Sequence, residues 1–350
     1  MQKMTSRQRT TKTFSFEQTD RPPIDLMESN VWPALRSYFY NKYDFSNDEQ
    51  ILTHMHADFR WLYTGSPEKM NKHEFDADGA DEAGSYTDDV ERPLTNAHSA
   101  GDVIKMFSPD ASQTVVADFE GAKARWPEFP FILVPYWMPI FSGACEAFGM
   151  QEAMVKMHLE REVFKAYAQI QSDYSVGVFK KNVEAGARDY CDYAWIGDDF
   201  AGETGLLLSP DMWRELIKPY LKKTIRYLKD AGFKVLFHSC GAVREVIPDL
   251  IDMGVDALLV IQTSAQGMVV EELAQHYGGK IVFFGAIDAQ HLLTFGSPDD
   301  IRKEVIRNYR AFENCGGYVV ANSHTCMADI KGENIDEMST AAFGLPGIAR

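Results

Sequence analysis

Two short motifs in the sequence each pair an imidazole with a thiol. His238 and Cys240 are separated by one residue, and His324 and Cys326 repeat that spacing nearer the C-terminal end. Residues two apart point to the same side while the chain stays extended, so either pair could present both side chains to one metal ion. Imidazole nitrogen and thiolate sulfur together favour Zn²⁺ over Mg²⁺ or Ca²⁺. Three protein ligands with an open fourth position would make such a site catalytic.

The spacing alone does not exclude a purely structural role for His238 and Cys240. Free cysteine is among the most buried residue types, so Cys240 could pack as a small apolar side chain while His238 bonds to the backbone. The chain has 5 cysteines, and they are widely scattered. An odd, scattered set fits reduced thiols or metal ligands better than a disulfide framework.

Strands and helices alternate around these motifs. A short apolar run, Lys234 to Phe237, leads directly into His238, and further apolar runs separated by helix patterns lie at 194–196, 257–261, 281–284 and 318–321. The clearest helix pattern opens at Ser209-Pro210, with a hydroxyl at the N-cap and proline at the first position, and Gly232 is placed to stop it. Repeated strand-then-helix units with apolar strands predict a parallel sheet covered by helices.

The predicted fold is therefore α/β, and its simplest architecture is a single-domain (β/α)8 TIM barrel over residues 1–350 with an N-terminal excursion. Residues 68–96 are polar, acidic and rich in Gly and Asp, which predicts a long loop in that half. A doubly wound open sheet would give similar local patterns, so periodicity alone leaves that alternative open.

Polar residues follow each apolar run, at the strand ends where parallel α/β folds form their active sites. Asp198 and Asp199 follow one run, Asp288 follows another, and Gln262 follows a third. All three are catalytic candidates: Asp198 or Asp199 would orient substrate or a metal-bound water, and Asp288 could fix the imidazole through a hydrogen bond. Gln262 is a candidate for binding substrate or for fixing the imidazole through a hydrogen bond.

Aromatic residues crowd two N-terminal segments, 53–63 and 130–141. Packing in the core is the commoner role of such clusters, and lining a substrate pocket is the alternative. We take Tyr136 and Trp137 as candidates for contacting substrate, with Arg60 as a candidate for binding a charged or polar substrate group.

The net charge of -16 argues against nucleic acid or an anionic membrane surface as the main partner, because both require a basic footprint. No uninterrupted apolar run reaches about 18 residues, and the basic N-terminal segment has no apolar stretch behind it. We therefore expect a soluble, cytoplasmic protein that acts on small molecules.

Several stretches together resemble the uroporphyrinogen decarboxylase superfamily: "RPPIDL", "HADFRWL", "KVLFHSCGAVREVIPDL", "GAIDAQHLL" and "GENIDEM". The resemblance runs from about residue 4 to the C-terminal end and is most specific in the C-terminal half. It implies a (β/α)8 barrel, as the strand and helix patterns do independently.

Motifs separate the two main branches of this superfamily. The decarboxylases hold a polycarboxylate substrate with an arginine-containing N-terminal segment, where this chain has the acidic stretch Asp25-Leu26-Met27-Glu28. The motif at His238 and Cys240 resembles that of zinc-dependent corrinoid methyltransferases, which move a methyl group between a small substrate and the cobalt of a separate corrinoid (cobalamin) protein. The resemblance thus implies an enzyme with Zn²⁺ as cofactor and a corrinoid protein as partner.

The resemblance also implies a third zinc ligand near the last strand. The position that is Cys in thiol-methylating members falls on His324, and Cys326 lies two residues later. We favour Cys326, because a second thiolate matches the ligand set of those relatives.

Three hypotheses about function follow. The leading one is methyl transfer, either from a methyl donor or to a thiol acceptor, and the aromatic N-terminal segments favour O-demethylation of a methoxylated aromatic compound. The second is a metal-free decarboxylase of a porphyrinogen or other carboxylated ring, with Arg60 and the aspartates binding the substrate. The third is a corrinoid-binding protein without turnover, which the clustering of ionisable groups at strand ends disfavours.

Overall fold

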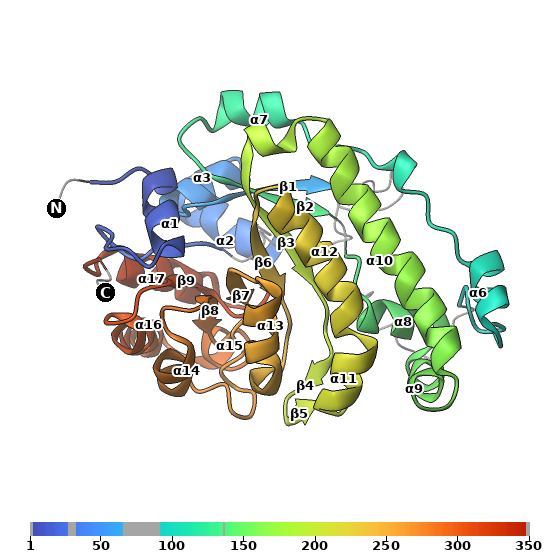
Figure 1. Cartoon of the computed structure of the whole chain (residues 1–350). Helices are drawn as coiled ribbons and strands as arrows, with labels where there is room; N and C mark the ends of the chain where they lie inside the picture. The colour runs from blue at the N-terminus through green and yellow to red at the C-terminus, as the bar shows by residue number, and fades with distance from the viewer. Residues whose placement is uncertain (1–2, 27–32, 66–91, 136, 348–350) are drawn as a thin grey trace.

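The computed structural model describes residues 3–26, 33–65, 92–135 and 137–347. Within them, the strands of the main sheet are β1 (Arg60–Thr64), β2 (Phe131–Pro135), β3 (Cys191–Gly197), β6 (Lys234–His238), β7 (Ala257–Leu259), β8 (Val282–Ile287) and β9 (Tyr318–Asn322). They form a 7-stranded sheet in that order, and every neighbouring pair is parallel (Figure 1). The α/β prediction is confirmed, with each strand run starting or ending within a few residues of its expected position.

The curled sheet is not closed into a complete barrel by strand pairing among the described residues. Between β9 and β1 lies a short segment whose pairing is an isolated bridge from Ile24 to Val320. Just before β1, the Asp58 backbone N–H also donates to the Ile24 carbonyl at 2.7 Å. Pro22 and Pro23 have no N–H to donate, so this segment does not extend into a ladder. The predicted closed (β/α)8 barrel is thus corrected to a barrel-like sheet.

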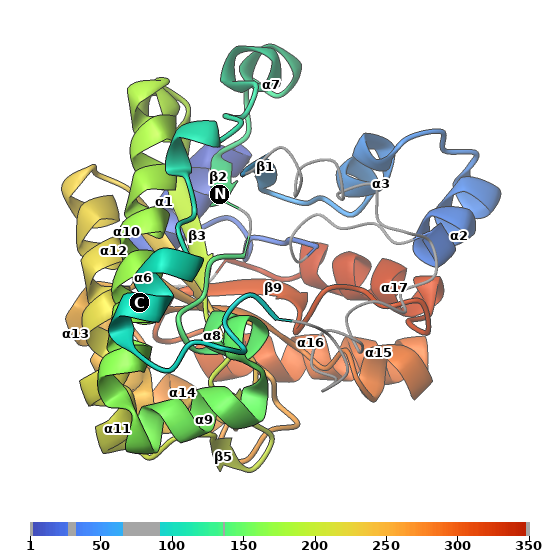
Figure 2. The same ribbon diagram turned by 90° about the vertical axis from the view of Figure 1, so that its right-hand side faces the viewer.

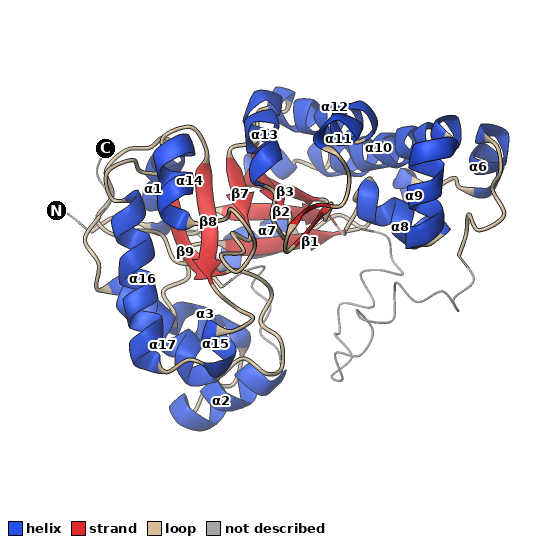
Figure 3. Cartoon of the chain, turned by 90° about the horizontal axis from the view of Figure 1, so that it is seen from below, coloured by secondary structure: helices blue, strands red, loops and turns tan. Residues whose placement is uncertain are grey.

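The described α-helices lie around this sheet, and several of them cover its outer face (Figures 1 and 3). They are α1 (Ser6–Phe14), α2 (Pro33–Tyr43), α3 (Asp48–His54), α6 (Ala100–Met106), α7 (Phe119–Arg125), α8 (Phe141–Phe148), α9 (Met150–Leu159), α10 (Arg161–Glu184), α11 (Pro210–Leu216), α12 (Lys218–Asp230), α13 (Ile247–Met253), α14 (Val270–Tyr277), α15 (Leu292–Phe295), α16 (Pro298–Phe312) and α17 (Gly332–Phe343). A small antiparallel hairpin, β4 (Ala201–Gly202) with β5 (Gly205–Leu206), follows β3. Helices α2 and α3 stand on one side of the molecule, and α6, α8 and α9 on the other (Figure 2).

The helix predicted from Ser209 onward forms as two pieces. Ser209 caps α11 by accepting a hydrogen bond from the Met212 N–H, as the sequence predicts. The chain then breaks at Ile217, and α12 begins with a proline in its first turn, Pro219. Proline cannot donate an i→i−4 hydrogen bond and disfavours helical geometry in the residue before it, which explains the break.

The strands are buried on both faces, and their side chains divide into two packed clusters. Alternate strand residues, such as Trp61, Trp195 and Phe284, form an inner cluster, while the others pack against the helices. Phe14 of α1 joins the inner cluster, with its ring centroid 4.7 Å from that of Tyr193. Because both faces are filled, polar side chains can reach solvent and substrate mainly at the strand ends.

A buried ionic cluster fixes α1 to the start of β1. The Asp58 carboxylate is 0% exposed, and it accepts hydrogen bonds from Arg9 at 2.6 Å and from Arg21 at 2.7 Å. Arg9 also bonds to Asp20 at 2.7 Å. Removing one partner of such a buried pair would leave an uncompensated charge, so these contacts hold α1 in one position.

None of the described helices is both long enough and apolar enough to serve as a membrane span.

Candidate metal centre

The two residues of the first His-x-Cys motif meet at the carboxyl end of β6. His238 is the last residue of the strand, and its Nε2 lies 3.5 Å from the Cys240 Sγ. Asp199, which follows β3, places its Oδ1 3.8 Å from the same nitrogen and accepts a hydrogen bond from the Cys240 backbone N–H at 2.7 Å. Ligand atoms from all three side chains lie within 4.8 Å of one another. Parallel pairing of β3 with β6 brings these residues together, because Gly197 and His238 are in register.

The geometry of this cluster fits the metal that the sequence predicts. Tetrahedral zinc, with bonds of about 2.3 Å to sulfur and about 2.0–2.1 Å to nitrogen, would hold those two atoms about 3.6 Å apart. The observed Sγ···Nε2 distance is 3.5 Å. The set of one nitrogen, one sulfur and one carboxylate is also within the ligand range of zinc. His238 is 5% exposed, whereas Asp199 and Cys240 are half-buried, so the cluster opens to solvent on one side.

Gly241 gives the loop after β6 its shape. Its φ is +84, a left-handed conformation that favours glycine. A Cβ on Gly241 would lie 2.7 Å from the carbonyl oxygens of Ala201 and Gly202 in the β4–β5 hairpin. The hairpin therefore packs directly on the loop, and the N–H of Ala242 donates to the Gly202 carbonyl at 2.9 Å.

The two adjacent carboxylates after β3 have different roles. Asp198 is 0% exposed, and its oxygens accept hydrogen bonds from the backbone N–H groups of Ile140, Phe141 and Ser142 at 2.8 to 3.2 Å. Burial raises the pKa of Asp198 to about 7, and the N–H donors of Phe141 and Ser142 act in the opposite direction. Asp198, predicted as a catalytic candidate, thus caps the first turn of α8, and Asp199 is the carboxylate beside His238.

The second His-x-Cys motif does not assemble in the same way. The Cys326 Sγ is fully buried in the helix-side cluster, 3.5 Å from the Asn322 Nδ2 that donates to it. Burial raises the pKa of this thiol to about 12. The His324 ring faces the centre instead, with its centroid 6.3 Å from that of His238. Among the described residues, the candidate metal cluster includes neither Cys326, the favoured third ligand, nor His324.

Two further candidates, Asp288 and Arg60, make contacts away from this cluster. Asp288 accepts from the Gln290 backbone N–H at 2.9 Å and lies 3.3 Å from the His291 Nδ1, so it holds the turn after β8. Arg60 makes a two-point ion pair with Glu49 at 2.6 and 2.9 Å, which occupies its guanidinium. Tyr136 lies outside the described residues.

Gln262 does reach the site, but through the backbone. Its Oε1 accepts a hydrogen bond from the Gly241 N–H at 2.8 Å. It therefore bonds to the loop that carries Cys240, and not to the imidazole as one reading of the sequence expects.

Two indole rings flank His238. The ring centroid of Trp137 lies 5.5 Å from that of His238, and the centroid of Trp195 lies 5.6 Å from it. Gly197 makes this possible, because a Cβ there would lie 2.6 Å from a ring atom of Trp137. Of these three residues, only Trp137 is among the predicted site residues; Trp195 and Gly197 are not. The alternation of side chains along a strand could have indicated both residues, because it places 195, 197 and 199 on one side of an extended chain.

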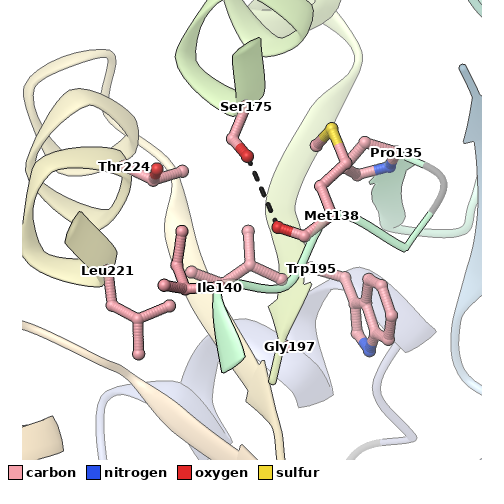
Figure 4. Close-up of a pocket in the computed structure, with 9 residues that line it drawn as sticks. Pro135, Met138, Ile140, Ser175, Trp195, Gly197, Leu221 and Thr224 are labelled. Carbon is pink, nitrogen blue, oxygen red and sulfur yellow. Dashed lines mark hydrogen bonds between the residues drawn. The ribbon is translucent and has the colours of Figure 1, made fainter. Parts of the chain in front are cut away.

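A small cavity lies behind β3, on the side covered by α10 and α12 (Figure 4). Its volume is about 20 Å³, and Met138, Ser175, Leu221 and Thr224 are among the residues lining it. Ser175 donates to the Met138 carbonyl at 3.4 Å across it. The space suits about one water molecule, so it is not a substrate pocket.

Comparison with known proteins identifies the family. The profile of the uroporphyrinogen decarboxylase (URO-D) family matches residues 139–343. A curated relative, uroporphyrinogen decarboxylase from Pelodictyon phaeoclathratiforme (strain DSM 5477 / BU-1), is 26% identical over 206 residues, covering 56% of this chain and 54% of the relative. The chain thus spans about half the length of the curated relative it matches.

A solved structure shares the fold. A methyltransferase from Methanosarcina mazei aligns with a TM-score of 0.66 at 15% identity, covering 97% of this chain and 99% of that one. At this identity the likeness concerns the fold. The family match, by contrast, extends over more than half of the sequence, and the chain therefore belongs to the uroporphyrinogen decarboxylase (URO-D) family.

Proposed function

We propose that this protein is a zinc-dependent methyltransferase that moves a methyl group between a small methylated substrate and the cobalt of a corrinoid protein. The observation that carries the proposal is the cluster of His238, Cys240 and Asp199 at the carboxyl ends of β3 and β6, where the Sγ···Nε2 distance is 3.5 Å. Membership of the URO-D family and a fold shared with a methyltransferase support it.

The proposed ligands are His238, Cys240 and Asp199, which leave a fourth position for the substrate. His324 lies in the loop after β9, with its ring centroid 6.3 Å from that of His238. Cys326 would have to leave the helix-side core to join them, so it is not among the proposed ligands. A zinc ion bound here would act as a Lewis acid on the heteroatom that carries or receives the methyl group.

The surrounding residues would orient the substrate and limit access of water. Trp137 and Trp195 both pack beside the imidazole, and their own ring centroids are 5.6 Å apart. Trp137 is half-buried, so part of its indole remains available for stacking. An aromatic ring in the substrate would stack favourably there, which supports a methoxylated aromatic compound as the methyl donor.

A metal-free decarboxylase is the second candidate, because the curated relative matched over 206 residues is a uroporphyrinogen decarboxylase. This hypothesis assigns Arg60 to substrate carboxylates, but the Arg60 guanidinium is 2.6 Å from Glu49 and its side chain is 3% exposed. A cationic group neutralised in this way is a poor cradle for a polyanion. The second candidate predicts porphyrinogen binding and no metal.

The test is metal content by mass spectrometry, followed by a transfer assay. Protein purified without chelator should contain about one zinc per chain, and a double variant His238→Ala, Cys240→Ala should contain none. Cys191→Ser serves as a matched control, because Cys191 is a buried thiol at the opposite end of β3. The assay follows the loss of cob(I)alamin absorbance with a methoxylated benzoate as donor. Transfer by the double variant at the wild-type rate would overturn the proposal.

A further inference from the structure

Both peptide units that flank Cys240 are held by side chains from neighbouring strands. The backbone N–H of Cys240 donates a hydrogen bond to the Asp199 carboxylate at 2.7 Å. The next backbone N–H belongs to Gly241 and donates to Gln262 at 2.8 Å. Since these peptide planes determine φ and ψ of Cys240, the two acceptors together fix the direction of its Cα–Cβ bond and limit the positions that its Sγ can reach.

Gln262 is itself fixed by a chain of side-chain hydrogen bonds. Its Nε2 donates to the Gln290 Oε1 at 3.1 Å, and the Gln290 Nε2 donates to the Glu203 carboxylate at 3.2 Å. Ser264 donates to the same Gln290 oxygen at 2.7 Å. The chain therefore connects the loops after β6, β7 and β8 to the β4–β5 hairpin.

The three hydrogen bonds that link Gly241, Gln262, Gln290 and Glu203 all have the same donor-to-acceptor direction. Each amide accepts through its oxygen and donates through its nitrogen, from the Gly241 N–H to the carboxylate of Glu203. Bonds arranged in series polarise one another, so a carboxylate at the far end strengthens the acceptor at Gln262. The backbone adds two links, from Ala242 to Gly202 at 2.9 Å and from Gln266 to Glu203 at 2.7 Å.

We propose that Gln262 is a positioning residue for the metal centre, which orients the Cys240 thiolate by holding the Gly241 N–H. The inference rests on the proposed zinc site, and it assigns Gln262 neither to substrate nor to the imidazole. It follows from geometry: the Gln262 Oε1 contacts the loop 2.8 Å from the Gly241 nitrogen, while the Cys240 Sγ approaches His238 to 3.5 Å. Changing a side chain that orients a ligand in this way weakens metal binding by about 10–100-fold.

The test compares Gln262→Met with a matched control, Gln266→Met. Methionine has nearly the length of glutamine but no hydrogen-bonding amide. Gln266 lies in the same loop and is exposed, and only its backbone N–H enters the links described above. Zinc affinity is measured by competition with a chromophoric chelator, on protein whose thermal unfolding midpoint without metal is also recorded. We expect about 10–100-fold weaker binding for Gln262→Met and less than 2-fold change for the control.

A further variant separates positioning from folding. Gln262→Glu keeps an acceptor for the Gly241 N–H and should retain affinity to within about 3-fold. With Co²⁺ in place of zinc, the thiolate-to-cobalt charge-transfer absorption reports Cys240 directly, and it should fall in Gln262→Met. Equal affinity and equal absorption in wild type and Gln262→Met would overturn the inference. A wild-type protein that binds neither metal would instead overturn the proposed function.

Discussion

The loops after β6 and β9 share a His-x-Cys motif, yet they present it differently. After β6, the two side chains converge to 3.5 Å, and Gly241 follows the cysteine with a left-handed φ of +84. After β9, Cys326 is buried in the helix-side cluster, and Met327 follows it. The same spacing therefore produces a paired site in one loop and separated side chains in the other.

The difference comes from where each strand stops. His238 is the last residue of β6, so the chain is still extended when it reaches the motif. β9 ends at Asn322, two residues before His324, and the chain has already turned. Asn322 stabilises that turn, because its Nδ2 donates to the His324 carbonyl and to the Cys326 Sγ. A two-residue spacing predicts a shared site where the motif begins within the strand, as at His238, and not where it begins after the chain has turned.

The strongest test of this comparison exchanges each thiol for a hydroxyl. We expect Cys240→Ser to reduce zinc content from about one per chain to almost none, since serine is a poor zinc ligand. Cys326→Ser should keep its zinc, because Cys326 lies in the helix-side core. Mass spectrometry of both purified variants checks the pair. Loss of zinc in Cys326→Ser alone would reverse the assignment.

The second test concerns the glycine that only the first loop contains. We expect Gly241→Ala to lower the free energy of unfolding by about 2–4 kcal/mol, since the left-handed φ costs alanine about 1 kcal/mol and the steric overlap adds about 1–3 kcal/mol. Urea denaturation of the protein without metal gives the measurement. Gly101→Ala is the control, because its Cβ would come no closer than 3.7 Å to a neighbour. An unchanged Gly241→Ala midpoint would mean that the hairpin does not restrain the loop.

The third test removes the Asn322 side chain, which stabilises the turn after β9. Asn322 is 0% exposed, so Asn322→Ala should lower the free energy of unfolding by about 1–3 kcal/mol by leaving buried acceptors unsatisfied. Zinc content should stay near one per chain, because the β6 loop makes the metal site. Denaturation and metal analysis on the same preparation check both statements, and a parallel loss of zinc would show that the loops are coupled.

The smallest expected effect is that of removing the His324 imidazole, which lies in the loop after β9. The His324 ring centroid lies 6.3 Å from that of His238, so His324→Ala should change zinc affinity by less than about 3-fold. Chelator competition measures it. A loss as large as that of Cys240→Ser would identify His324 as a ligand and place Asp199 outside the set.

The elements of the C-terminal half could be predicted because local signals mark their limits. Apolar runs mark the strands, and Ser209 and Gly232 mark where helical structure begins and ends. The closure between β9 and β1 could not be predicted in this way. Closure depends on the tertiary contacts that the segment around Ile24 makes with β9 and with the start of β1. Pro22 and Pro23 in that segment lack N–H donors.

The candidate site was predictable in part for the same reason. His238 ends a strand that the local pattern identifies and Cys240 follows two residues later, so the sequence predicts that the two side chains can meet. Asp198 and Asp199 could have been separated too, because adjacent side chains on an extended chain point to opposite sides. The burial of Cys326 could not be foreseen, since it depends on the turn that Asn322 stabilises.

The buried ionic cluster of Asp58 with Arg9 and Arg21 bears on the order in which the chain can fold. Arg9, Arg21 and Asp58 all precede Tyr193, whose ring packs on Phe14, by more than half of the distance from Phe14 along the chain, so their ion pairs can form before Tyr193 is synthesised. Helix α1 can thus be tethered before its place in the inner cluster exists. A recombinant fragment limited to residues 139–343 would lack this helix together with β1 and β2, and would expose the inner aromatic side chains that they cover.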